Sequence, residues 1–158
     1  MLISASFVET CTTLLDAHAD VNFVMPRGAY SAQLSVLGAD APSPNGFYAQ
    51  KNTQRGNGAT ALHIAVENGH AALVALLLQR GAEQLPSMEG VAPLLLAVQY
   101  HHPHIALVLA RHNPDRAVLD AVAPHDGASA LFAAAGSGYA ELVGALLTLG
   151  ADPDVQVT

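Results

Sequence analysis

The sequence predicts an all-α protein in which pairs of short helices stack side by side as a repeat solenoid. Three observations support this prediction. One arrangement of residue types returns three times along the 158 residues, which is the signature of a repeat architecture. Apolar residues make up 51% of the chain and recur at helical spacing. Glycine and proline stand beside the apolar runs, where they end and begin helices.

Composition and charge exclude several classes of protein. Only 12% of the residues are charged, which is typical of a folded chain rather than a disordered one. Six basic against thirteen acidic residues give a formal net charge of -7, so no basic field attracts nucleic acid. The longest apolar runs, at 71–78 and 91–98, hold eight residues each, too few to span a membrane. We therefore expect neither nucleic acid nor a membrane as partner.

The N-terminal residues and the number of cysteines indicate the cellular compartment in which the protein is expected. The first residues carry no basic lead, so no signal peptide is indicated. Cys11 is the single cysteine, so the chain forms no internal disulfide. We interpret Cys11 as a small apolar core residue and expect a cytoplasmic protein.

Residues 57–84 hold the clearest repeat. Thr60 is the predicted N-cap of its first helix, since its hydroxyl can accept a bond from a free backbone N–H one turn later. Gly69 and Gly81 are predicted to end the first and second helices in the left-handed conformation. The second helix carries one apolar stripe, formed by Leu73, Val74, Leu77 and Leu78. A neighbouring repeat must cover that stripe.

Two further copies occupy residues 85–115 and 127–158. Gly90 lies 32 residues after Gly58, and Gly127 lies 37 residues after Gly90, which brackets a period of about 33 residues. Pro93 fits the first turn of a helix, where its missing N–H is no loss. The extra residues of the longer interval are predicted to form an extended loop over 116–126.

These residues resemble the ankyrin repeat family, whose pattern is Gly-x-Thr-Pro-Leu-His-x-Ala-Ala, then Gly-His, Val-x-x-Leu-Leu and Gly-Ala-Asp. The clearest repeat matches it at Thr60, Leu62, His63, Ala65, Gly69, His70, Val74, Leu77, Leu78, Gly81 and Ala82. In the next copy Leu95 replaces the motif histidine and His101 replaces the glycine between helices. The resemblance implies an ankyrin-type helical repeat solenoid with projecting hairpin loops, in which His63 braces neighbouring loops by hydrogen bonding.

The remaining segments fit the repeat less well. Residues 1–22 are predicted to be a partial N-terminal repeat, with His18 in place of its closing glycine. Residues 23–56 are either an inserted loop or a decayed repeat, the latter supported by Leu37-Gly38-Ala39-Asp40. We favour the loop because of its many turn residues. Asp152-Pro153-Asp154 resembles the lead-in to another repeat. This suggests part of a larger protein, although terminal repeats can also be degenerate.

The resemblance implies a protein–protein interaction module that binds its partner on a concave face made of loop tips and first helices. The positions that it assigns to this face are Asn57, Glu67, Asn68, Met88, Glu89, Gln99, Tyr100, His125, Asp126 and Ser137. Tyr100 and Met88 are expected to contribute most of the binding energy, unless Tyr100 packs on the next repeat instead. Because Glu67, Glu89 and Asp126 are acidic, a neutral or basic protein partner is favoured over an acidic one.

Two other functions are weighed against this one. The chain could be a structural spacer or a self-association segment with exposed apolar ends. More remotely, His101, His102 and His104 could bind a metal, but no carboxylate is close to them in sequence. The chain has no Gly-x-Ser-x-Gly elbow and no glycine-rich phosphate loop. We therefore expect neither catalysis nor a cofactor.

Overall fold

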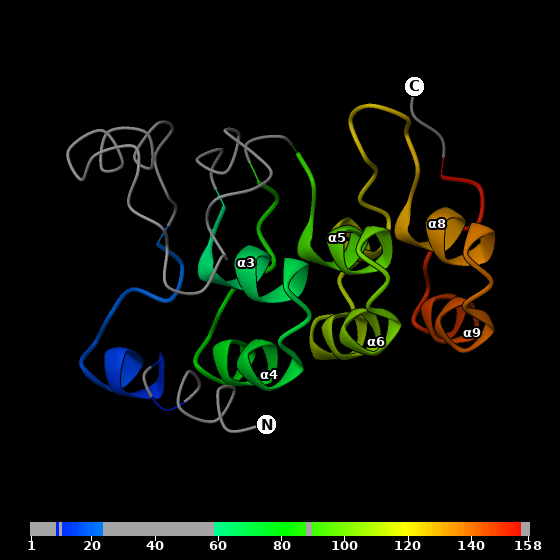
Figure 1. Ribbon diagram of the computed structural model, residues 1–158. Coiled ribbons are helices and arrows are strands. Elements are labelled where there is room, and N and C mark those ends of the chain that lie inside the picture. The colour runs from blue at the N-terminus through cyan, green and yellow to red at the C-terminus, as the bar shows by residue number, and fades with distance from the viewer. Residues whose placement is uncertain (1–8, 10, 24–58, 88–89, 156–158) are drawn as a thin grey trace, which may run out of the picture.

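The computed structural model describes residue 9 and residues 11–23, 59–87 and 90–155 of the protein. Three pairs of helices follow one another along the described chain (Figure 1). The first helices of the pairs are α3 (Ala61–Glu67), α5 (Pro93–Gln99) and α8 (Ala130–Gly136), and the second helices are α4 (Ala71–Gln79), α6 (Pro103–His112) and α9 (Ala140–Thr148). Residues 11–16 form a further helical segment near the N-terminus.

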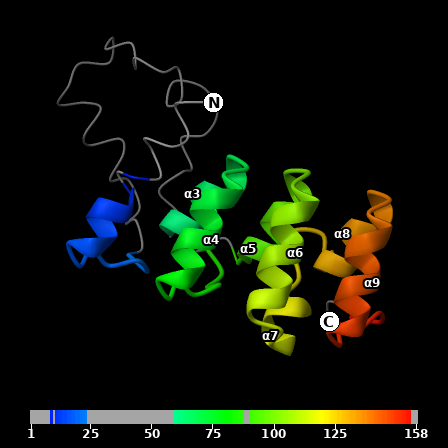
Figure 2. The ribbon, with the colours of Figure 1, turned by 90° about the horizontal axis from the view of Figure 1, so that it is seen from below.

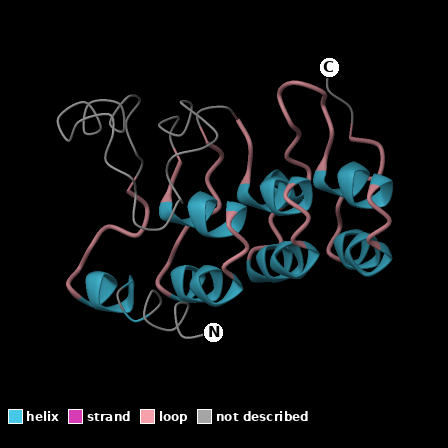
Figure 3. Cartoon of the chain, in the orientation of Figure 1, coloured by secondary structure: helices cyan, strands magenta, loops and turns pink. Residues whose placement is uncertain are grey.

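The helices form two layers. In one layer α3 contacts α5 and α5 contacts α8, while in the other α4 contacts α6 and α6 contacts α9. The two layers are the upper and lower rows of Figure 1, and Figure 2 shows the same stack turned by a quarter. The loops that join one pair to the next rise above the row of first helices (Figure 3). This is the stacked, all-α architecture that the sequence predicts.

The helix ends follow the predicted signals. Thr60 is the N-cap of α3 and forms a reciprocal capping box with His63. Pro93 is the first residue of α5, where its missing N–H breaks no helical bond. Gly69 and Gly81 have φ angles of 71° and 87°, so both adopt the left-handed conformation that ends a helix.

Two histidines take the same conformation as these glycines. His18 and His101 have φ angles of 63° and 61° and are the non-glycine residues with positive φ in the described part of the chain. Both stand where the repeat pattern has glycine. The fold therefore imposes the left-handed turn even where the sequence offers a side chain that disfavours it.

The predicted apolar stripe lies in the core. Leu73, Val74, Leu77 and Leu78 are all buried, and the first helices contribute the equally buried Leu62 and Leu94. Cys11 is half-buried against this core, as expected for a small apolar residue. Its burial raises the pKa of the thiol above the ordinary value.

The structure differs from the sequence prediction between α6 and α8. Within the predicted extended loop over 116–126 the chain forms a one-turn helix, α7 (Arg116–Leu119). Asp115 caps this helix by accepting a bond from the backbone N–H of Ala117, at 3.1 Å, and Leu119 is fully buried. One turn is too short to produce a visible hydrophobic period, so the sequence pattern could not reveal it.

The segment from residue 24 to residue 56 lies outside the described residues, so the choice between loop and decayed repeat stays a prediction. No helix in the described part of the chain is both long and apolar enough to cross a membrane.

Candidate partner-binding face

Five of the predicted binding residues occupy equivalent places in successive repeats, at the C-terminal ends of the first helices. Glu67 is the last residue of α3 and Asn68 its C-cap, Gln99 and Tyr100 have these places on α5, and Ser137 is the C-cap of α8. We call Glu67, Asn68, Gln99, Tyr100 and Ser137 the helix-end row. Since α5 packs between α3 and α8, the row runs across three neighbouring repeats.

Tyr100 and Glu67 are in direct contact within this row. The Tyr100 hydroxyl donates a hydrogen bond to Oε1 of Glu67, at 3.2 Å. This bond joins Tyr100 to the preceding repeat and leaves the side chain 43% exposed. Nearly half of the surface of Tyr100 thus stays accessible.

The other members of the row differ in their hydrogen bonds and exposure. Nδ2 of Asn68 donates to the carbonyl oxygen of Ile64 on its own helix, at 2.7 Å. Gln99 and Ser137 are exposed. The row therefore presents an aromatic ring, a carboxylate, two amides and a hydroxyl to solvent or a partner.

The remaining predicted residues lie elsewhere. His125 and Asp126 are exposed in the loop between α7 and α8, before the start of α8 rather than at its end. Oδ1 of Asp126 accepts a bond from the backbone N–H of Ala128, at 3.1 Å, which shapes the turn. Asn57, Met88 and Glu89 lie outside the described residues, so their assignment stays a prediction.

The sequence reasoning missed an apolar part of the same face. Ile64 on α3 is 41% exposed, and the equivalent residues Leu96 and Ala133 are half-buried. Ile64 precedes Glu67 by three residues and so lies on the same side of the helix. The signal was available, because Ile64 occupies a variable position of the repeat pattern, next to the motif histidine.

His63 joins the first complete repeat to the loop of the next. Its Nδ1 accepts a bond from the backbone N–H of Thr60, at 3.2 Å, so the neutral ring carries its proton on Nε2. Nε2 lies 3.3 Å from the carbonyl oxygen of Val91, to which it donates. Burial lowers the pKa of His63 below its ordinary value, and the hydrogen bond to Val91 opposes that shift. The brace that the family resemblance implies is present.

Two of the three histidines considered for metal binding contact different groups. Nδ1 of His101 lies 3.0 Å from the Tyr139 hydroxyl, and Nε2 of His102 lies 3.4 Å from the carbonyl oxygen of Glu67. Across the described chain, no three histidine, cysteine, aspartate or glutamate side chains gather as a metal site would need.

Stacked helix pairs, left-handed turns between them and a bracing histidine define a helical repeat protein. Ankyrin repeat family models match residues 2–118, as three copies, and residues 126–157. The chain belongs to the ankyrin repeat family, whose repeats are protein-interaction modules.

Two curated relatives share this repeat region. The B-cell lymphoma 3 protein homolog of Mus musculus is 38% identical over 97 residues, which cover 60% of this chain and 21% of that protein. The ankyrin repeat protein nuc-2 of Neurospora crassa is 36% identical over 95 residues, which cover 60% of this chain and 9% of that protein. The similarity therefore spans about a fifth of the length of one relative and about a tenth of the length of the other.

Proposed function

We propose that the chain binds a protein partner on the face formed by the helix-end row and the neighbouring Ile64, and that it has no catalytic role. The observation that supports this proposal most is the register of the row. The C-cap of the first helix is Asn68 in one repeat, Tyr100 in the next and Ser137 in the third. These three side chains differ in chemistry, although they occupy equivalent positions of the same fold. Such freedom on a rigid scaffold is typical of a binding surface.

The partner is expected to offer an apolar site for Tyr100 and Ile64, surrounded by neutral or basic groups. Tyr100 is the candidate anchor because aromatic residues dominate interface energies. Glu67 and the net charge of -7 favour a basic rather than an acidic surface. We infer a cytoplasmic setting, since a single cysteine is compatible with a reducing compartment.

The test compares two variants with side chains of nearly equal exposure. Tyr100→Ala removes a side chain from the row that is 43% exposed, while Val108→Ala removes one from α6, in the other layer, that is 42% exposed. Proteins captured by the wild-type chain are purified, and their affinity for each variant is measured by calorimetry. We expect Tyr100→Ala to weaken binding by about thirtyfold, the equivalent of a 2 kcal/mol hot spot, and Val108→Ala to leave it unchanged.

Equal affinity of the wild-type and Tyr100→Ala chains for every captured protein would remove the row from the binding site. A loss caused by Val108→Ala instead would place the site on the second helices. Circular dichroism of both variants establishes that they are folded.

A second candidate function, self-association, is favoured by Phe132. This residue has the place in its repeat that His63 and Leu95 have in theirs, yet it is 72% exposed while they are buried. Leu147 on α9 is also 47% exposed. Two such side chains on one helix pair provide apolar surface that a second copy of the chain could cover.

Light scattering over a concentration series tests self-association. We expect the average mass of the wild-type chain to rise with concentration and that of Phe132→Ser to stay at 16.3 kDa. A wild-type chain that remains monomeric at the highest concentration contradicts this second candidate and leaves the first untouched.

A further inference from the structure

Four equivalent positions are buried in the first two helix pairs and accessible in the last. They are the third and sixth residues of each first helix and the fourth and eighth residues of each second helix. In the first two pairs these residues are at most 4% exposed, namely His63, Val66, Val74, Leu78, Leu95, Val98, Ala106 and Ala110. In the last pair they are Phe132, Ala135, Val143 and Leu147, which we call the end face. Phe132 is 72% and Leu147 47% exposed, Ala135 is exposed and Val143 is half-buried.

The difference follows from what covers each pair. α5 contacts α3 and α6 contacts α4, and α8 and α9 contact α5 and α6 in the same way. The pair α8–α9 lies at one end of the stack of described helices (Figure 1). A repeat of this kind relies on its neighbour to bury its apolar side. The end face is therefore apolar surface of the kind that a following helix pair covers elsewhere in the chain.

The segments that follow the second helices carry polar side chains that bond the backbone of the next unit. In the first unit this side chain is that of Asn22. Its Oδ1 accepts from the backbone N–H of Glu83, at 2.9 Å, and its Nδ2 donates to the carbonyl oxygen of Gly81, at 3.4 Å. Both partners lie just after α4, so the bonds join the first unit to the second.

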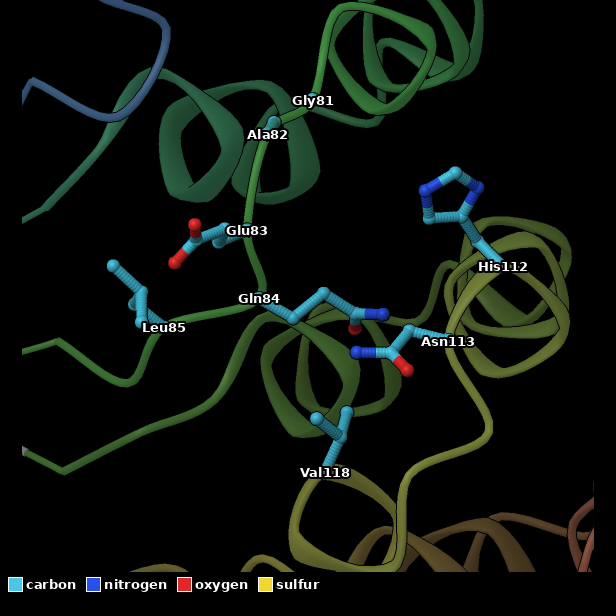
Figure 4. Close-up of a pocket in the computed structure, with 8 residues that line it drawn as sticks. All are labelled: Gly81, Ala82, Glu83, Gln84, Leu85, His112, Asn113 and Val118. Atoms are coloured by element: carbon cyan, nitrogen blue, oxygen red, sulfur yellow. The ribbon is translucent and has the colours of Figure 1, made fainter.

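The two later junctions are bonded in a comparable way. Nε2 of Gln84, which follows α4, donates to the carbonyl oxygen of Leu109 on α6, at 2.9 Å. Figure 4 shows this side chain extending toward Asn113, the C-cap of α6. Oδ1 of Asp120, which follows α6, accepts from the backbone N–H of Asp152 after α9, at 2.8 Å. At all three junctions in the described chain a side chain of one unit thus bonds the backbone of the next.

The segment after α9 has the local geometry of the segment that contains Asn22. The backbone N–H of Asn22 donates to Oδ1 of Asp20, and the backbone N–H of Asp154 donates to Oδ1 of Asp152, both at 2.9 Å. Asp154 is therefore the equivalent of Asn22, and it is exposed. Its carboxylate can accept a backbone bond from a next unit, as Asn22 and Asp120 do.

We propose that the end face binds one further helix pair of the same polypeptide, which stacks on α8 and α9 as α5 and α6 stack on α3 and α4. The occupant has to cover Phe132 in the layer of first helices and Leu147 in the layer of second helices, and to reach Asp154 beside them. A helix pair in the register of the earlier units meets all three places, and in this chain each covering pair follows the pair that it covers. The proposal does not rest on the helix-end row, because the two surfaces share no residue.

The test extends the chain by one unit and measures whether that unit docks on the end face. A copy of residues 127–155 is added directly after Thr158, where an interval of 32 residues, as between Gly58 and Gly90, places the next opening glycine. A copy of residues 90–115, which contains the pair that covers α3 and α4, serves as a second extension. We expect slower amide hydrogen exchange in α8 and α9 of the extended chains than in the 158-residue chain. Unchanged exchange in α8 and α9 with both extensions overturns the proposal.

Paired variants distinguish docking on the end face from a general effect of the extension. We expect Phe132→Ala to lower the free energy of unfolding at least twice as much in an extended chain as in the 158-residue chain, because the ring is buried only in the former. Val108→Ala, on α6 and 42% exposed, should have the same effect in both. Asp154→Ala should destabilise the extended chain only, through its lost bond. Equal losses in the two chains from Phe132→Ala or from Asp154→Ala contradict the proposal.

The urea measurements are made at a concentration at which light scattering finds only monomer, so that self-association does not contribute. If neither extension docks and the 158-residue chain associates through Phe132, a second copy is the occupant and the proposal is wrong. Either result leaves the helix-end row untouched, because that row is tested through Tyr100→Ala.

Discussion

Replacing Gly69 with alanine tests two separate features of the turn between α3 and α4. Gly69 has a φ angle of 71°, a conformation that costs an alanine about 1 kcal/mol. A Cβ atom at this position would also lie 2.7 Å from Cε1 of His102 in the next repeat. The imidazole would have to turn away and lose its contact with the carbonyl oxygen of Glu67, at a cost of about 1 kcal/mol.

The chain contains a matched control for the first of these costs. Gly138 has a φ angle of 74°, and a Cβ atom there would meet nothing within 4 Å. We therefore expect Gly138→Ala to lower the free energy of unfolding by about 1 kcal/mol, and Gly69→Ala to lower it by about 2 kcal/mol, the sum of the strain and the lost contact. In a His102→Ala background Gly69→Ala should cost only about 1 kcal/mol, because the obstructing ring is gone.

Urea denaturation of the wild type, the single variants and the double variant measures these differences. The free energy of unfolding must fall with urea concentration at the same slope in all variants, because only then do differences between midpoints report differences in free energy. If Gly69→Ala and Gly138→Ala cost the same within about 0.5 kcal/mol, or if removing His102 leaves the cost of Gly69→Ala unchanged, the contact between these repeats does not contribute as reasoned.

Three further predictions follow from burial, protonation and hydrogen bonding. Leu77→Ala removes a side chain that is 2% exposed and should cost about 2–5 kcal/mol in urea denaturation, whereas Leu147→Ala, at 47% exposed, should cost well under half as much; equal costs would misplace the core. Because the pKa of His63 is lowered, its contribution to stability is fully present above about pH 6.5 and is lost as the pH falls below that value. His63→Gln should reduce the pH dependence of the urea midpoint in this range, and an unchanged dependence would refute the assignment. Asn22→Ala should cost about 1 kcal/mol through its two lost bonds, and unchanged hydrogen exchange at the Glu83 amide would contradict that role.

The parts of the fold that the sequence predicted are those set by local rules. Thr60, Pro93, Gly69 and Gly81 act on the turn in which they lie, so their effects can be read from spacing alone. The single turn of α7 was missed because it depends on the Asp115 cap and on burial of Leu119. The left-handed conformation at His101 agrees with its place in the repeat, where the pattern has glycine, whereas the residue type alone argues against it.

For the candidate site, the sequence predicted the positions of residues but not the contacts between repeats. The register of the repeats places Glu67, Gln99 and Ser137 at helix ends, as the structure has them. The bond between Tyr100 and Glu67 spans 33 residues, and that between Gln84 and Leu109 spans 25. Such contacts form only when the repeats stack, so the pattern of neighbouring residues in the sequence does not reveal them.

The stacking of α3 on α5 and of α5 on α8 has a consequence for how binding and stability are linked. Each unit is held mainly by its neighbours, so units at the edge can come apart while the others persist. A partner that contacts Glu67, Tyr100 and Ser137 at once would hold three units together and so stabilise their stacking. Its affinity would then appear as slower hydrogen exchange well beyond the atoms that it touches.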